Sequence, residues 1–201
     1  TKDLRTPPRF DAESLQLTLG AGFTLQEVQE IATSHGLIYP VDTPSRALAT
    51  IGGTVATNAG GVRVLAFGMT GQHVVGVRIV LSDGSVIDRL SRLKKENTGF
   101  DITKLAIGSE GTLGVITDVC LQLTYPREVK WTALVPCESI ADALKLAVPH
   151  QQQLLAAEIF QADAANKVAE TEGMKVLPQG STWWLLLEGD NAKPELPTGT
   201  L

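Results

Sequence analysis

The chain has 201 residues, of which 43% are hydrophobic, and its formal net charge at pH 7 is −5. This length and composition fit a folded protein of one large or two small domains. No run of Lys and Arg points to a nucleic-acid partner, and no apolar stretch approaches the ~20 residues of a membrane-spanning helix. We therefore expect neither nucleic-acid binding nor a transmembrane segment. The chain starts at Thr1 without an initiating Met and ends after a polar stretch, so we expect it to be a fragment of a longer protein.

The first part of the chain predicts a sheet with a few helices. Alternating apolar residues predict strands, Asp83-Gly84 predicts a hairpin turn, and Thr24 with Glu27 forms a capping box before a helix that ends at Gly36. Asp101 caps a short helix that Gly108 ends, and Asn97 to Gly99 is a loop. The predicted elements are strands at 15–19, 74–81, 85–90 and 115–123, and helices at 25–35 and 102–107.

The character of the sequence changes near Tyr125-Pro126. Beyond it, strands and helices alternate in the order β-α-β-α-β, which indicates a second α+β unit. The predicted elements are strands at 129–135, 156–161 and 182–187, and helices at 140–148 and 162–171. We expect an α+β fold with a boundary at 124–128, which gives domains at 1–125 and 126–201.

A stretch rich in Gly and Ala, TIGGTVATNAGG, runs from Thr50 to Gly61. Side chains this small should not fill a core, but they let a ligand approach the backbone closely, and backbone amides can then bind polar groups. The alternative is that two elements simply pack closely here. The stretch matches neither GxGxxG nor GxxxxGK[ST], so it supports neither a Rossmann fingerprint nor a P-loop.

A second stretch, GSEGTLG, runs from Gly108 to Gly114 and places the carboxylate of Glu110 between glycines. Such a carboxylate can accept hydrogen bonds from hydroxyl or ring N–H groups. The three histidines are far apart in the sequence, so we predict no metal site. Cys120 and Cys137 stand alone, which favours a reducing compartment: the cytoplasm or, alternatively, the mitochondrial matrix.

Three segments of the sequence point to a family far more specifically together than any one of them does alone. They are PVDTPSRALATIGGTVATNAGG (40–61), IVLSDG (79–84) and LKKENTGFDITKLAIGSEGTLGVIT (93–117), in one order and spacing. The combination resembles the FAD-linked oxidase family of the vanillyl-alcohol oxidase superfamily. Within it, the chain resembles the group of D-2-hydroxyglutarate dehydrogenase, D-lactate dehydrogenase and the glycolate oxidase flavin subunit. The resemblance is strong over about residues 13–125 and looser beyond.

The resemblance implies a flavin domain of two α+β subdomains with FAD between them. Residues 1–125 would be the second half of that domain, lacking the N-terminal subdomain with the pyrophosphate loop, and residues 126–201 would begin an α+β cap, or substrate, domain. Matching the family's motifs gives a set of cofactor-binding candidates: Asp42, Thr50, Gly52, Gly53, Thr57, Asn58, Gly60, Gly61, Glu110, Gly111, Gly114 and Ile116.

The activity that the resemblance implies is FAD-dependent oxidation of a D-2-hydroxy acid, by hydride transfer from substrate to flavin. The implied partners are that acid and an electron acceptor, with a homo-oligomer as one assembly. No catalytic base can be assigned from these residues. A flavoenzyme with other chemistry, such as an alkyl-glycerone-phosphate synthase or a sugar-lactone oxidase, remains an alternative, as does a non-catalytic chain. We expect the 201-residue chain alone to hold FAD weakly and to be inactive.

Overall fold

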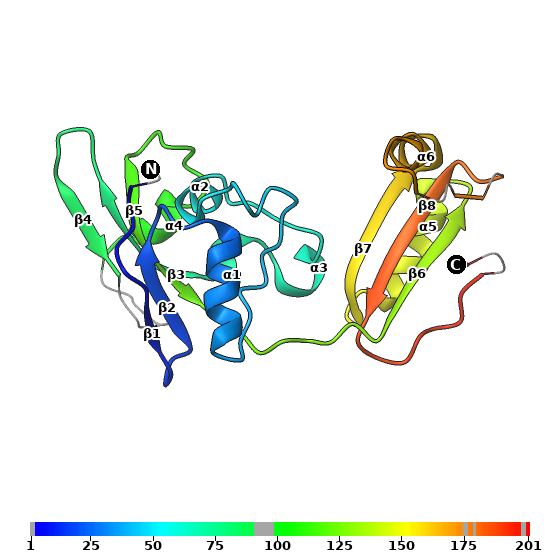
Figure 1. The fold of residues 1–201 in the computed structure, drawn as a ribbon, viewed down its shortest axis with the longest axis horizontal. Helices are drawn as coiled ribbons and strands as arrows, with labels where there is room; N and C mark the ends of the chain where they lie inside the picture. Colours follow the sequence, from blue (N-terminus) through cyan, green and yellow to red (C-terminus); the bar gives the residue numbers. More distant parts are fainter. Residues whose placement is uncertain (1–2, 91–98, 175–176, 179, 198–199) are drawn as a thin grey trace. The chain divides into compact units, whose positions relative to one another are not determined.

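The computed structural model describes residues 3–90, 99–174, 177–178, 180–197 and 200–201. The chain divides into two compact units, Thr1–Pro126 (unit 1) and Arg127–Leu201 (unit 2) (Figure 1). Each unit combines helices with an antiparallel sheet, which confirms the α+β class. The loop expected at Asn97-Thr98 lies outside the described residues.

Unit 1 contains a five-stranded antiparallel sheet in the order β1-β2-β5-β3-β4. The predicted 74–81 and 85–90 strands form the hairpin β3–β4 around Gly84, whose φ of +85° lies in the left-handed region. The elements of unit 1 are β1 (Arg9–Asp11), β2 (Gln16–Gly20), α1 (Leu25–Ser34), α2 (Ile51–Ala56), α3 (Val64–Phe67), η1 (Thr70–Gln72), β3 (Val74–Val80), β4 (Val86–Arg89), α4 (Ile102–Ala106) and β5 (Val115–Gln122).

Helix α1 begins and ends as the sequence predicts. The backbone amide of Glu27 donates to Thr24 Oγ1 at 3.2 Å, and the amide of Thr24 donates to Glu27 Oε2 at 2.8 Å, so the capping box is complete. The helix then stops before Gly36, whose φ is +71°. Leu25 and Val28, on the inner face of α1, are fully buried.

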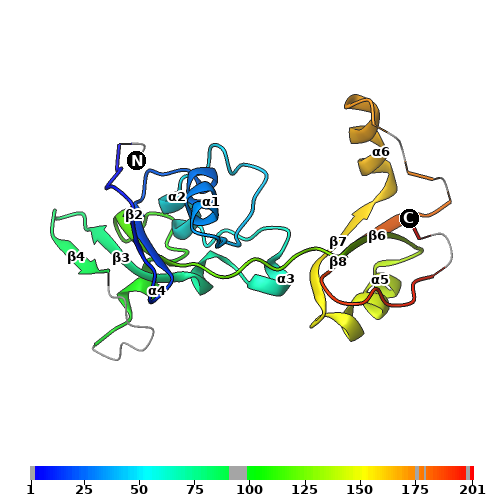
Figure 2. The same ribbon diagram turned by 60° about the horizontal axis from the view of Figure 1, so that its bottom comes forward.

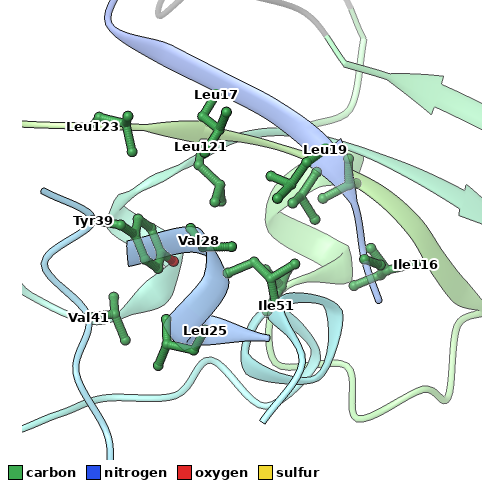
Figure 3. Packing of buried hydrophobic residues seen from close by; sticks show 14 of the residues in the cluster. Leu17, Leu19, Leu25, Val28, Tyr39, Val41, Ile51, Ile116, Leu121 and Leu123 are labelled. Atoms are coloured by element: carbon green, nitrogen blue, oxygen red, sulfur yellow. The ribbon is translucent and has the colours of Figure 1, made fainter. Parts of the chain in front are cut away.

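The core of unit 1 lies between the sheet and helices α1 and α2 (Figure 3). Leu17, Leu19 and Leu121 extend from the central strands toward Leu25 of α1 and Ile51 of α2, and all five are fully buried. The expectation that the first glycine-rich stretch cannot fill a core is therefore wrong. Its residues 51–56 form a helix, and its two largest side chains are buried.

Unit 2 contains a three-stranded antiparallel sheet in the order β6-β8-β7. Helix α5 lies against this sheet (Figure 2), and Ala143 of α5 packs with buried residues from all three strands. Strand β8 is not a neighbour of β5, because the two belong to different sheets. The elements of unit 2 are β6 (Trp131–Cys137), α5 (Ile140–Ala147), η2 (Val148–His150), β7 (Leu154–Gln161), α6 (Ala162–Thr171) and β8 (Trp183–Gly189).

Candidate functional site

Helix α2 is held at its N-terminus by the protein itself. Thr50 is its N-cap and accepts from the amide of Gly53 through Oγ1 at 3.2 Å. The amide of Ile51 donates to the carbonyl of Phe23, and that of Gly52 to the carbonyl of Ala21, at 2.7 and 2.9 Å. The amides that usually bind an anion at a helix start are therefore already used. The first four residues of the glycine-rich stretch do not form the amide cradle that the sequence suggested.

The C-terminus of α2 ends in a Schellman motif. Asn58 has a φ of +48°, and its amide donates to the carbonyl of Val55 at 3.1 Å. The amide of Ala59 donates to the carbonyl of Thr54 at 2.8 Å. These are the two bonds that define the motif, with Asn58 at the position that glycine usually occupies. The chain therefore leaves α2 in a fixed direction toward Gly60 and Gly61.

The second glycine-rich stretch binds directly to this end of α2. The amide of Gly108 donates to the carbonyl of Val55 at 3.1 Å, and the amide of Glu110 to the carbonyl of Ala56 at 2.8 Å. Glu110 has a φ of +50°, an unusual value for a residue with a side chain. The two stretches, about 50 residues apart in sequence, are thus neighbours, and backbone hydrogen bonds join them.

The candidate glycines fall into two classes. A Cβ on Gly52 would lie 2.6 Å from the Cβ of Ala21, one on Gly61 would overlap the carbonyl of Asp42, and one on Gly114 would lie 2.5 Å from the carbonyl of Val80. These glycines allow close packing within unit 1. A Cβ on Gly60 would likewise meet a side chain, that of Val64, at 2.9 Å.

Gly53 and Gly111 differ from these glycines because they are exposed and open. A Cβ on Gly53 would approach only Thr50 Oγ1, at 3.1 Å, and one on Gly111 would have no atom within 4 Å. Neither residue is needed as glycine for packing, although Gly111 also has a φ of +79°. An open glycine leaves room for a ligand to reach the backbone.

Several donors within or next to the two glycine-rich stretches have no acceptor. In the described part of the chain, no acceptor is found for the amides of Gly60, Gly61 and Val62, nor for those of Gly111 and Leu113. The hydroxyl of Ser109 is buried and also has no partner. Gly60 and Gly61 are half-buried, and buried donors are normally paired, whereas the amides of the exposed Val62, Gly111 and Leu113 are open to solvent. All of these donors are suited to a ligand that is rich in oxygen acceptors.

The side chains of Asp42 and Thr57 each interact with another group of the protein. Asp42 pairs with Arg46 at 3.0 Å and lines a shallow pocket of about 170 Å³ with Arg63 and Phe67. Thr57 is exposed and donates through Oγ1 to the carbonyl of Gly53 at 3.0 Å.

Two candidates lie at opposite extremes of exposure. The side chain of Ile116 is buried in the core, so only its backbone can face a ligand (Figure 3). Glu110 is exposed, and no hydrogen bond or ion pair of its carboxylate is found in the described part of the chain.

The sequence did not identify Thr70 and Gly71, which form hydrogen bonds with the residues just after α2. Thr70 is fully buried, and its Oγ1 donates to the carbonyl of Ala59 at 2.7 Å. The amide of Gly71 donates to Asn58 Oδ1 at 2.8 Å. The only sequence signal is a polar residue between an apolar segment and a glycine, which does not reveal partners eleven and thirteen residues away.

His73 is held by a hydrogen bond within the protein. His73 Nε2 lies 2.7 Å from the carbonyl of Phe67, and burial lowers the pKa of this histidine. It is a half-buried residue with a hydrogen-bond partner. Among the described residues, no group of three or more His, Cys, Asp or Glu side chains could hold a metal ion. No helix in the described ranges is long and apolar enough to cross a membrane.

Residues 2–89 match the family described as FAD binding domain. The chain is 42% identical over 123 residues to D-2-hydroxyglutarate dehydrogenase from Xanthomonas citri pv. viticola, covering 61% of this chain and 26% of that protein. It is 36% identical to glycolate oxidase subunit GlcD from Bacillus subtilis, covering 94% and 37%. It is 31% identical to D-lactate dehydrogenase from Anaerostipes hadrus, covering 85% and 36%. The chain thus spans between 26% and 37% of the length of these relatives.

Among solved structures, one of alkyldihydroxyacetonephosphate synthase superposes with a TM-score of 0.71 at 18% identity, over 94% of this chain and 37% of that one. At this identity the likeness establishes the fold. The family match and the relatives at 31–42% identity bear out the resemblance to FAD-linked oxidases that the three sequence segments indicated.

Proposed function

We propose that this chain, whose residues 2–89 match the FAD binding domain family, lines part of the FAD site of an oxidoreductase that acts on D-2-hydroxy acids. Relatives at 31–42% identity carry the names D-2-hydroxyglutarate dehydrogenase, glycolate oxidase subunit and D-lactate dehydrogenase. These three substrates are all 2-hydroxy acids. The common chemistry supports the substrate class, and we leave the individual acid open among the three.

One observation carries the cofactor part of this proposal. The amide donors without an acceptor, at Gly60, Gly61, Val62, Gly111 and Leu113, lie within or directly after the two stretches that meet at the C-terminus of α2. FAD presents a pyrophosphate and ring carbonyl oxygens, which are acceptors for such donors. The open surface at Gly53 and Gly111 supplies the room, so the residues present fit this cofactor.

We assign the candidate residues different roles toward FAD. Gly53 and Gly111 admit the cofactor to the backbone, and the amides after Asn58 and Glu110 donate to its oxygens. The free carboxylate of Glu110 accepts from a hydroxyl or ring N–H group. The other candidates act through their backbone or by supporting these residues: Asp42, Thr50, Gly52, Thr57, Gly61, Gly114 and Ile116.

A bound FAD would supply the hydride acceptor for oxidation of the substrate carbon that carries the hydroxyl. The residues of this chain would hold and orient the cofactor. We further propose that residues 1–125 contribute to the FAD-binding domain and that residues 126–201 belong to the substrate domain. Cys120 and Cys137 are buried and form no disulfide in the described part of the chain, which supports a reducing compartment, the cytoplasm or the mitochondrial matrix.

The test uses the complete product of the gene that encodes this chain. The protein is purified, its flavin is released and identified, and the bound flavin is mixed without oxygen with D-lactate, glycolate or D-2-hydroxyglutarate. The L-enantiomers of the two chiral acids are the controls. We expect one acid to bleach the flavin absorbance and its L-enantiomer, where one exists, to leave it unchanged. A protein without flavin contradicts the cofactor assignment. A flavin that none of the acids reduces contradicts the substrate class and favours other flavin chemistry.

A further inference from the structure

We propose that Asn58 is a positioning residue, which fixes three segments of the candidate site through its side chain and does not use that side chain to contact the cofactor. The segments are Gly60–Val62, Thr70–Gln72 and Gly108–Gly111. The inference rests on the proposed function only in assigning these segments to a flavin-binding surface. The contacts of Asn58 that position them are present in the chain without a ligand.

The backbone position of Asn58 does not by itself call for asparagine. At the C′ position of a Schellman motif, glycine adopts the left-handed conformation without a steric cost, whereas asparagine pays part of that cost. The φ of +48° at Asn58 is therefore tolerated but is not the reason for the side chain. The reason must lie in what the side chain contacts.

The side chain of Asn58 reaches across to η1. Its Oδ1 accepts from the amide of Gly71 at 2.8 Å, and the preceding Thr70 donates to the carbonyl of Ala59 through both its amide, at 3.0 Å, and its Oγ1, at 2.7 Å. Two consecutive residues at each end are thus tied together. These bonds close the segment 60–69 into a loop with a fixed base, and the unpaired amides of Gly60, Gly61 and Val62 lie just beyond that base.

Asn58 also packs against the second glycine-rich stretch. A Cβ on Gly108 would lie 3.6 Å from the Cβ of Asn58, and the amides of Asn58 and Gly108 share the carbonyl of Val55 as acceptor. A Cβ on Gly71 would lie 3.0 Å from both Asn58 Oδ1 and Ile107 Cγ2. Gly71 therefore fits closely between Asn58 and the residue before Gly108, so η1 and the second glycine-rich stretch meet at the Asn58 side chain, two residues before Gly60.

A positioning role and a direct contact with FAD predict opposite effects for two substitutions. Asn58→Asp keeps an acceptor oxygen for Gly71 and tolerates the left-handed backbone, but a carboxylate repels the cofactor's phosphates. Asn58→Gly keeps the backbone conformation and removes the acceptor. Under the positioning role Asn58→Asp resembles the wild type and Asn58→Gly is impaired; under direct contact Asn58→Asp is the worse variant.

The experiment combines hydrogen exchange with FAD titration of the chain and of both variants, each followed by NMR. Without FAD, we expect exchange of the Gly71 amide to accelerate about tenfold in Asn58→Gly and less than about threefold in Asn58→Asp. With FAD, we expect the dissociation constant to rise about fivefold to tenfold in Asn58→Gly and to stay within about twofold in Asn58→Asp.

Each outcome decides a separate question. Unchanged exchange of Gly71 in Asn58→Gly overturns the positioning role. FAD binding that is weaker in Asn58→Asp than in Asn58→Gly overturns it in favour of direct contact. Exchange that follows the expected pattern in a chain that shows no response to FAD at any concentration supports the positioning role, and it is then the proposed function that fails.

Discussion

The backbone amide of Glu110 donates to the carbonyl of Ala56 at 2.8 Å, and this bond joins two glycine-rich stretches from distant parts of the chain. Carbonyl groups at a helix C-terminus need partners from outside the helix, and Glu110 supplies one. To do so, Glu110 adopts a φ of +50°, which costs energy for a residue with a Cβ. Its exposed carboxylate is consequently held next to Gly111, where it can meet a ligand.

Gly53→Ala should separate cofactor binding from folding. The new methyl group would approach only Thr50 Oγ1, at 3.1 Å, and alanine is favoured over glycine within a helix by about 0.5 to 1 kcal/mol. We expect the stability of unit 1 to stay equal or rise while the dissociation constant for FAD increases at least about tenfold, because the methyl group fills the open surface. Thermal unfolding by circular dichroism and FAD titration measure the two effects. Undiminished FAD affinity would show that the cofactor does not approach Gly53.

Gly52→Ala is the matched control for Gly53→Ala. Its methyl group would lie 2.6 Å from the Cβ of Ala21 in the interior of unit 1. Overpacking of this kind costs about 1 to 3 kcal/mol. We expect Gly52→Ala to lower the stability of unit 1, in contrast to its neighbour. Equal stability of the two variants would contradict the packing described for α2.

Gly189→Ala should destabilise unit 2 without affecting unit 1. A Cβ at this position would overlap the ring of Trp131, whose Nε1 donates to the carbonyl of Asn191 at 2.9 Å. All three tryptophans of the chain lie in unit 2, so tryptophan fluorescence reports the unfolding of that unit. We expect the fluorescence transition to lose about 1 to 3 kcal/mol of unfolding free energy.

Gly52→Ala serves again as the comparison for Gly189→Ala, since it alters only unit 1. If the units unfold separately, Gly52→Ala leaves the fluorescence transition where it is in the wild type. A parallel loss in both variants would instead indicate one cooperative transition for the whole chain.

Glu27 makes the stability of unit 1 depend on pH in the acid range. The Arg5 guanidinium, 2.8 Å away, and the amide of Thr24 lower the pKa of Glu27 to about 2 from an ordinary value of 4.5. A lowered pKa contributes stability that is present above pH 4.5 and is lost as the pH falls from 4.5 toward 2. The contribution is small and sensitive to salt, because both side chains are more than a third exposed.

Arg5→Met tests the cause of this shift. We expect the pKa of Glu27, followed by the NMR shift of its carboxyl carbon, to move up toward the ordinary value but not to reach it, because the Thr24 amide remains. Arg46→Met, which removes the partner of Asp42, is the control and should leave Glu27 unchanged. An unchanged pKa of Glu27 in Arg5→Met would assign the whole shift to the capping box.

The parts of the fold that sequence predicts are those with local causes. The capping box of Thr24 and Glu27, the hairpin turn at Gly84 and the cap at Asp101 each involve residues within four positions of one another. Helix α2 could not be predicted in this way, because two adjacent glycines disfavour a helix. It forms because the carbonyl groups of Ala21 and Phe23 and the core around Ile51 stabilise it.

The candidate site shows the same division between local and distant causes. Its residues can be selected from the sequence by resemblance, but their roles depend on neighbours that are far away in the chain. Gly61 faces the carbonyl of Asp42, whereas Gly53 and Gly111 face open space, and no local pattern distinguishes them. The role of Asn58 likewise cannot be inferred from its neighbours in the sequence, because it depends on a hydrogen bond with Gly71.

The most direct test of the proposed flavin site is an NMR titration of the isotope-labelled chain with FAD, which detects weak as well as tight binding. We predict that the shifted amides will cluster at Gly60 to Val62 and at Gly111 to Leu113, the donors without acceptors. ADP and riboflavin, added separately, should each shift a subset of these amides. Shifts confined to other parts of the chain, or no shift up to the solubility limit of FAD, would contradict the account.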